Sequence, residues 1–215
     1  MPIVPPLRWR DGGGWLILRS YGDLNDPITL DLDTQTLTKI ARGEPLAYLW
    51  AGGDIEDADT HLDLLEDLGA PTGYLVDLLT EDDETITAQL KDAGLIILGD
   101  GDERTLRSAL VGAAEAALMT AFRREGVILG IGAGARVLGS LLLTHGAGLG
   151  WVAGACILTD YDLTSAGDMA AVLLNNPGTY GIGIGAGAGL VLGGDGQIEV
   201  WGTGKVTVTL GGNPK

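Results

Sequence analysis

Two kinds of residue in this sequence could do chemistry: a turn of closely spaced glycines, and a set of acidic side chains. The glycine turn, residues 130–134, directly follows the apolar residues 127–129. A strand, a sharp turn and a helix form the nucleophile elbow of many hydrolases, whose apex residue attacks the substrate. A similar turn binds phosphate groups in nucleotide-binding proteins. The apex here is Gly132, so the pattern predicts an elbow without a nucleophile.

The acidic side chains follow two other apolar runs, and they are Asp100, Asp102, Glu103, Asp160 and Asp162. The carboxyl ends of neighbouring parallel strands meet at one edge of a sheet. These acids and the glycine turn are therefore expected to border one cleft. Hard cations prefer such oxygen ligands, and a cationic peptide would suit the same charge. Solvated carboxylates that cap helices are the simpler interpretation, and we favour it.

Apolar runs and amphipathic segments alternate along most of the chain and must position these residues. The segments predicted to be strands are 46–51, 73–79, 94–98, 127–129 and 151–158. The segments predicted to be helices are 54–68, 81–93, 104–124, 135–144 and 165–175. Repeated strand–helix units produce a parallel sheet covered by helices. The predicted fold class is α/β, a mostly parallel sheet flanked by helices, with short C-terminal strands at 190–192, 198–201 and 206–210.

The N-terminal segment has a different pattern. Apolar Ile28, Leu30 and Leu32 alternate with polar residues, which is the period of a half-buried strand. Residues 15–41 are therefore predicted to form an antiparallel β-hairpin. A chain of 215 residues can bury one full core. We expect a single α/β domain over 1–215, with a β extension at 1–44 and the main core at 45–215.

Composition narrows the classes of partner. The chain has 29 acidic and 13 basic residues, a net charge of −16, which repels nucleic acids and anionic membranes. No apolar run reaches the roughly 18 residues of a membrane span, so we expect a cytoplasmic protein. Residues 126–215 carry only 5 acidic and 3 basic side chains but 23 of the 36 glycines. A segment with so few charges is usually buried, either in the core or against another subunit. We therefore expect a homo-oligomer as one possibility.

Four motifs occur in the order found in the cyanophycinase and dipeptidase E family of serine peptidases, which the sequence resembles over residues 45–210. Residues 100–103, Asp-Gly-Asp-Glu, are similar to the Gly-Gly-Asn/Asp-Gln turn of the family. Residues 130–135, Gly-Ile-Gly-Ala-Gly-Ala, match its elbow, Gly-x-Ser-Ala-Gly-Ala. Residues 157–163 and 181–186 correspond to its Asp-Gln-His-Phe and Gly-Ile-Gly-Ile-Asp-Glu motifs. The resemblance implies a class I glutamine amidotransferase-like fold.

The catalytic positions of the family carry other residues here. The nucleophile position falls on Gly132, the base on Asp162 (or on Tyr161 with a shift of one), and the acid on Ala186. Acyl transfer needs a nucleophile and a base that takes its proton. The resemblance therefore implies a catalytically silent homologue that binds or self-assembles, without a metal or cofactor. What would remain of the pocket is Gly101, Asp102, Glu103, Ala133, Asp160 and Tyr161.

The alternative is an active serine-type exopeptidase, dipeptidase or amidohydrolase of this class with a relocated nucleophile. Cys156 lies mid-strand and is predicted to be a buried core thiol. We expect Ser140 to lie in the elbow helix, His145 to cap its end, and His61 to be solvated on an acidic helix. The sequence suggests no nucleophile–base pair among them. Residues 130–135 also match the glycine pattern of a dinucleotide-binding site. The acidic residue expected about 20 positions later in such a site is absent, so we do not favour this alternative.

Overall fold

A computed structural model describes residues 7–41, 43–143 and 146–211. The strands are β1 (Trp15–Arg19), β2 (Leu46–Trp50), β3 (Gly73–Asp77), β4 (Leu95–Leu98), β5 (Val127–Ile131), β6 (Gly139–Leu141), β7 (Val152–Thr159), β8 (Tyr180–Ile184), β9 (Ala188–Gly193), β10 (Ile198–Gly202) and β11 (Val206–Leu210). The helices are α1 (Pro27–Leu37), α2 (Ile55–Asp67), α3 (Asp83–Leu90), α4 (Glu103–Leu110), α5 (Ala113–Arg123), α6 (Ala133–Val137) and α7 (Ala166–Asn175).

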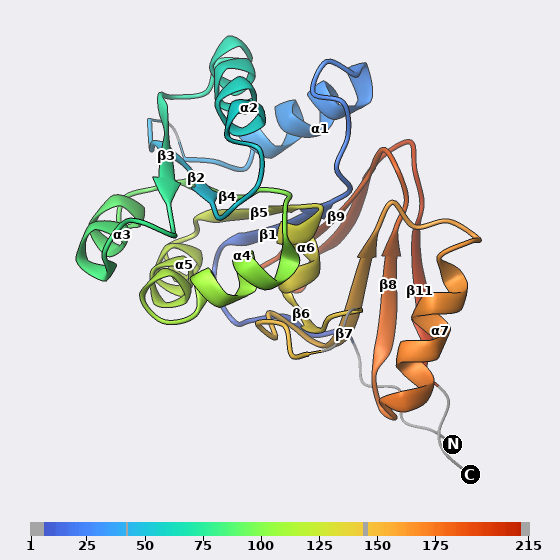
Figure 1. The fold of residues 1–215 in the computed structure, drawn as a ribbon. Helices are drawn as coiled ribbons and strands as arrows, with labels where there is room; N and C mark the ends of the chain where they lie inside the picture. The colour runs from blue at the N-terminus through green and yellow to red at the C-terminus, as the bar shows by residue number, and fades with distance from the viewer. Residues whose placement is uncertain (1–6, 42, 144–145, 212–215) are drawn as a thin grey trace.

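The described strands form two sheets (Figure 1). The larger has the order β10-β9-β1-β5-β4-β2-β3, in which β9 and β10 run antiparallel to their neighbours and the other pairs are parallel. The smaller has the order β11-β8-β7-β6, with β11 antiparallel to β8. The predicted α/β class with a mostly parallel sheet and short C-terminal strands is confirmed.

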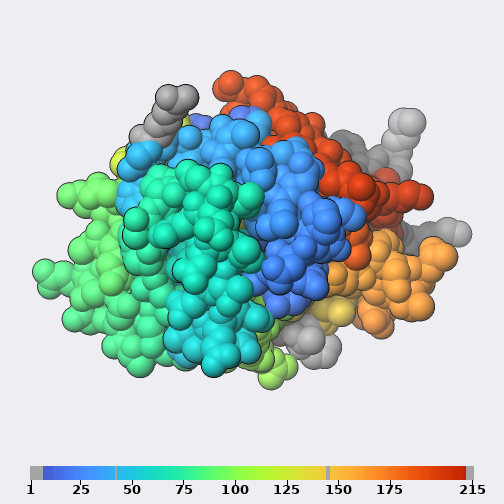
Figure 2. All heavy atoms as spheres, turned by 90° about the horizontal axis from the view of Figure 1, so that it is seen from above, coloured from blue at the N-terminus to red at the C-terminus, as the bar shows by residue number. Residues whose placement is uncertain are grey.

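Helices cover both faces of the larger sheet. The cluster on one face contains Leu32 of α1 with Leu62 and Leu65 of α2. The cluster on the other face contains side chains of α3 to α6 together with inward-facing residues of the smaller sheet. Figure 2 shows α1 and α2 side by side over the first of these faces, with the C-terminal strands alongside α1. Because central strands are buried on both faces, their sequences are continuously apolar, as in Leu95–Leu98.

The predicted N-terminal hairpin is wrong. β1 forms as expected, but residues 27–37 are helical, because Asp26 accepts the Ile28 N–H and Pro27 occupies the first turn. Both features start helices, and here they override the alternating pattern. The buried residues Thr29, Leu32, Asp33 and Thr36 follow helical spacing. β1 pairs instead with β5 and β9, so a strand from the predicted extension lies in the middle of the larger sheet.

Two predicted helices are shorter in the structure. The segment 104–124 is divided at Gly112, whose φ of 101° interrupts helical geometry between α4 and α5. The elbow helix ends at Val137, and Gly139 begins β6, which pairs in parallel with β7. Residue Thr144, the predicted end of that helix, lies outside the described residues. None of the described helices has both the length and the apolar character needed to cross a membrane.

Candidate functional site

The turn between β5 and α6 has the geometry of a nucleophile elbow. Gly132, at its apex, has φ 54° and ψ −114°, a conformation that glycine adopts with far less strain than other residues. The Gly132 N–H donates to the carbonyl of Arg19 at the end of β1, with 3.1 Å between N and O. The predicted strand, turn and helix are therefore present, and the adjacent strand holds the apex in place.

The Asp100 carboxylate lies against this apex. Asp100 Oδ1 accepts a 2.6 Å hydrogen bond from the Ala133 N–H. A Cβ atom added at Gly132 would lie only 2.3 Å from that same oxygen, far inside van der Waals contact. Asp100 thus fills the space that the side chain of a nucleophile would need.

The backbone amides of the turn are also occupied. In hydrolases with this elbow, the N–H of the residue after the nucleophile stabilises the oxyanion of the tetrahedral intermediate. Here that donor, on Ala133, is used by Asp100, and the Gly134 N–H donates to the Gly99 carbonyl at 3.2 Å. These donors are thus not available to an oxyanion or to a phosphate group, which disfavours the dinucleotide alternative as well.

Arg136 of α6 joins the charged groups around the elbow. Its Nε donates to Glu103 Oε2 at 2.7 Å, and its Nη1 donates to Thr159 Oγ1 at 2.8 Å. Its Nη2 lies 3.9 Å from Asp100 Oδ1. Burial and the Asp100 charge raise the pKa of Asp160, and Arg136 opposes that shift. The structure thus gathers acids from the ends of β4 and β7 around one arginine.

Other predicted pocket residues have structural roles. Asp102 caps α4 by accepting the Thr105 N–H at 2.8 Å. With Gly101, Glu103 and Arg136 it lines an open cleft of about 490 Å³, to which Ala133, Asp160 and Tyr161 do not contribute. The Tyr161 ring packs against Gly183 and the cluster under α7. Ala186, where the resemblance predicts the acid position, lies exposed in the turn between β8 and β9.

Comparison with solved structures identifies the fold. A peptidase from an acI-B1 Actinobacterium superposes with a TM-score of 0.76 at 20% identity, over 94% of this chain and 93% of that one. A candidate peptidase E protein from Listeria monocytogenes EGD-e superposes with a TM-score of 0.67 at 16% identity, over 88% and 98%. The chain has a peptidase-like fold. Its sequence matched no model of a protein family and no curated protein.

Within this peptidase-like fold, Asp162, the predicted base position, closes a turn just before α7. Asp162 Oδ1 accepts the N–H groups of Thr164 and Ser165, at 2.8 and 3.0 Å, just before α7. Hydrogen bonds from Thr164 and Ser165 lower the Asp162 pKa to about 2. The carboxylate is thus committed to a turn and is a poor proton acceptor near neutral pH.

The hydrogen bonds of Asp162 in this turn predict a pH-dependent effect on stability. Because the Asp162 pKa falls on folding, its stabilisation is present above its unfolded pKa of 3.8 and is lost as pH falls toward about 2. Asp162→Asn should lower the melting temperature at pH 7, and the difference from wild type should shrink between pH 4 and pH 2. Asp168→Asn, in the first turn of α7, is the control. An equal loss at pH 7 and pH 2 would contradict the assignment.

The candidate relocated nucleophiles are buried or hydrogen-bonded. Cys156 is fully buried, as predicted, and burial raises its pKa to about 11. Ser140 lies in β6, not in the elbow helix, and its Oγ donates to the Val152 carbonyl at 3.1 Å. His145 lies outside the described residues. Neither Cys156 nor Ser140 is presented to a cleft as a nucleophile with a base beside it.

The burial of Cys156 predicts slow thiol chemistry. At pH 8 a thiol with a pKa of about 11 is almost entirely protonated, and the thiolate is the reactive form. A disulfide reagent should therefore modify the native protein at least about 100-fold more slowly than the urea-unfolded protein. Stopped-flow absorbance with both samples measures this ratio. Equal rates would show an accessible, activated cysteine and revive the alternative of a relocated nucleophile.

Sequence reasoning missed a buried ionic cluster beside the elbow. His61 is buried, which corrects its predicted solvation, and its Nε2 lies 3.0 Å from Asp33 Oδ2. Arg19 Nη2 lies 3.0 Å from Asp33 Oδ1, and both side chains are 2% exposed. The usable signal was in α2, where His61 shares helical spacing with buried Ala58, Leu62 and Leu65. Arg19 and His61 also line a small hollow next to Ile131.

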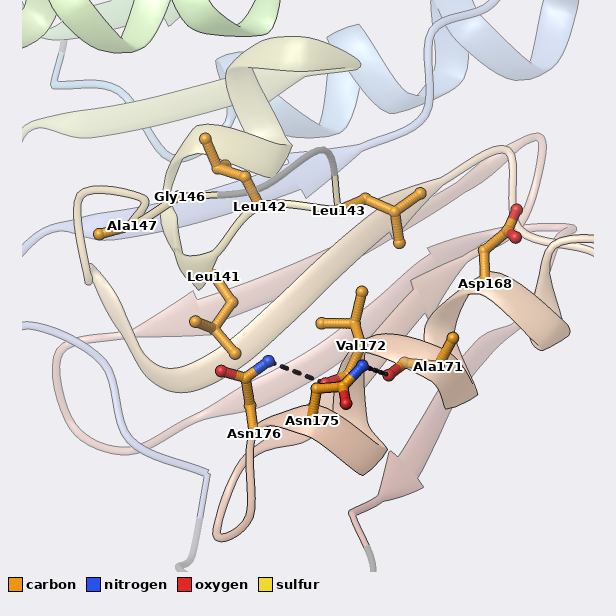
Figure 3. Close-up of a pocket in the computed structure, with 10 residues that line it drawn as sticks. All are labelled: Leu141, Leu142, Leu143, Gly146, Ala147, Asp168, Ala171, Val172, Asn175 and Asn176. Atoms are coloured by element: carbon orange, nitrogen blue, oxygen red, sulfur yellow. Dashed lines mark hydrogen bonds between the residues drawn. The ribbon is translucent and has the colours of Figure 1, made fainter.

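A larger hollow than the open cleft beside the elbow lies elsewhere among the described residues. A groove of about 710 Å³ lies between β6 with its following loop and α7 (Figure 3). Leucines 141–143 and Val172 line it, and the amides of Asn175 and Asn176 donate back to carbonyls of α7. Its described lining therefore offers an apolar surface and no nucleophile–base pair. Among the described residues, no three His, Cys, Asp or Glu side chains are placed to hold a metal ion.

Proposed function

We propose that this protein is a catalytically silent homologue of the cyanophycinase and dipeptidase E peptidases, acting by binding or self-assembly. The observation that carries the proposal is the position of Asp100. Its carboxylate occupies the nucleophile space at Gly132 and takes the oxyanion donor of Ala133. A negative charge at this point would repel the oxyanion that forms during acyl transfer.

The other family positions support the same proposal. Gly132 supplies no nucleophile, Ala186 supplies no acid, and the carboxylate of Asp162 is engaged at the start of α7. Acyl transfer requires these groups to act as one unit. Glycine at the apex also relieves strain that a serine would impose, which is advantageous once catalysis is not needed.

We infer a cationic peptide as the ligand if the elbow cleft still binds one. The carboxylates of Asp102 and Glu103 line the open cleft beside the elbow, and a basic group bound there would be attracted to their negative charge. Titration calorimetry with an arginine-bearing peptide tests this. Asp102→Asn, in the lining of the cleft, should weaken binding, whereas Asp195→Asn, in the exposed turn between β9 and β10, should not. We also propose a cytoplasmic location, since Cys156 has no second cysteine for a disulfide typical of secreted proteins.

Hydrolysis of a panel of aspartyl dipeptides and β-aspartyl-arginine by the wild type tests catalytic silence. We expect no turnover above buffer, and no labelling by a fluorophosphonate that reacts with activated serines. The double variant Gly132→Ser with Asp100→Gly is the control, because it restores a hydroxyl and its space but no base. It should also remain inactive. Clear turnover by the wild type would support the runner-up, an active peptidase or amidohydrolase with a relocated nucleophile.

A further inference from the structure

Among the described strands, β11 is the open edge of the smaller sheet, and its composition is unusual for an edge. It pairs with β8 on one side, and its sequence, Val-Thr-Val-Thr-Leu, contains no charge. Exposed edges normally carry charges, prolines or bulges that prevent pairing with another chain. β11 has high strand propensity throughout and none of these protections.

The other sheet edges are protected. The outer side of β6 is engaged by the following chain, where the Gly148 and Gly150 N–H groups donate to the carbonyls of Ser140 and Gly139. β10 carries Glu199, which is paired with Lys39 at 3.1 Å, and β3 ends at Asp77. A charged side chain on an edge strand disfavours pairing with another chain. β11 is therefore the edge best suited to accept one.

The apolar side of β11 is exposed. Val206, Val208 and Leu210 pair with Ile184, Ile182 and Tyr180 of β8, whose side chains belong to the core between the two sheets. Val208 and Leu210 therefore face the same way, yet each remains 55% exposed. The apolar core thus reaches solvent along this edge.

One exposed apolar side chain lies on α7, the helix that covers the other face of the smaller sheet. Leu174 of α7 is 77% exposed and lies on the side of the helix opposite to the groove residues Asp168 and Val172. The end of β11 runs beside the last turn of α7, where a Cβ on Gly211 would lie 3.6 Å from the Leu173 carbonyl. Figure 1 shows α7 next to β8 and β11. The β11 strand therefore has exposed apolar side chains on its inner face and threonines on the face toward α7, the helix that carries exposed Leu174.

We propose that β11 pairs antiparallel with β11 of a second copy of this chain, with the two-fold axis at Val208. This register places Val206 opposite Leu210 of the second copy and Thr207 opposite its Thr209. Apolar residues then meet on the inner face and threonines on the helix face, as in stable cross-strand pairs. The pattern complements itself, which an isologous interface requires. The two smaller sheets join into one, and Leu174 of each copy flanks the seam.

This inference gives a surface to the self-assembly in the proposed function, but it does not depend on catalytic silence. The test is the solution mass of the full chain by sedimentation, with hydrolysis measured on the same samples. We expect the wild type to have the mass of a dimer, twice the 22.2 kDa of one chain. An inactive monomer would overturn the interface and leave catalytic silence intact, whereas an active dimer would do the reverse.

Val208→Lys places two like charges face to face on the axis and should return the mass to 22.2 kDa. Val200→Lys is the matched control, because Val200 is 53% exposed on β10 and lies outside the proposed seam. It should leave the dimer intact. Circular dichroism of each variant shows that it is folded. If Val200→Lys disrupts the dimer and Val208→Lys leaves it intact, the interface is not at β11.

Val208→Cys tests the register without adding charge. Directly opposed residues of an antiparallel pair bring their Cα atoms to about 4.5–5.5 Å, within the separation of roughly 4.4–6.8 Å that a disulfide spans. Diamide should therefore link two copies of this variant through the introduced thiols, while Val200→Cys should remain unlinked. Native Cys156 is buried and does not compete in either variant. Absence of a linked dimer of Val208→Cys under conditions where the wild type is dimeric would overturn this register.

Discussion

Gly132→Ala is expected to destabilise the protein by about 1–3 kcal/mol, chiefly through strain in the backbone at the apex of the elbow. Two costs combine. The backbone, at φ 54° and ψ −114°, disfavours any Cβ, and the added atom would lie 2.3 Å from Asp100 Oδ1. Urea unfolding followed by tryptophan fluorescence measures the change in the free energy of unfolding.

Two controls separate those costs. Gly178→Ala meets no atom within 4 Å but has φ 83°, so it reports backbone strain alone, about 1–2 kcal/mol. Asp100→Gly removes the obstructing carboxylate, and Gly132→Ala should cost less in that background. If Gly132→Ala costs the same with and without Asp100, the carboxylate does not occupy the apex and the main support for catalytic silence is lost.

Asp33→Ala is expected to cost about 3–5 kcal/mol, because it leaves a buried guanidinium without its anion. Arg19 and Asp33 are each 2% exposed, and Asp33 also contacts His61. A total stability of roughly 5–15 kcal/mol is usual for a domain, so this loss would remove a large part of it. Thermal unfolding should show a correspondingly lower melting temperature.

The matched control is Asp31→Ala, since Asp31 lies in the same helix but is exposed, and its carboxylate accepts a hydrogen bond from the Gln35 side chain. It should cost less than about 1 kcal/mol. The double variant Arg19→Met with Asp33→Leu removes both charges, and it should be more stable than Asp33→Ala. If Asp31→Ala and Asp33→Ala lower the free energy of unfolding equally, the buried cluster does not stabilise the packing of α1 against β1.

Several elements could be predicted from local sequence. The alternation of apolar runs with acid-capped helices indicated the α/β class, because strand and helix periods are properties of short segments. The elbow was equally local, since residues 130–134 leave little choice of geometry between β5 and α6. The buried thiol of Cys156 followed from its place within an apolar run.

The N-terminal segment shows where local pattern fails. The alternation at residues 28–32 fits a strand, but the cap at Asp26 and the proline after it favour a helix. The alternating pattern and the helix-start signals therefore predicted different structures. The helix-start signals prevailed, because the Asp26 side chain satisfies a backbone N–H group of the first turn and the proline at that turn has no N–H to satisfy. The central position of β1 in the sheet could not be predicted from local sequence, because its partners β5 and β9 lie more than 100 residues away along the chain.

The sequence by itself determined the class of fold, the elbow and the missing nucleophile at Gly132, since each depends on residue types close together in the chain. Only the tertiary structure decided what fills the elbow. Asp100 lies 33 residues before Ala133, and Arg19, Asp33 and His61 come from three separate elements. Their charges are placed by sheet order and helix packing, and such long-range contacts leave no periodic trace in the sequence.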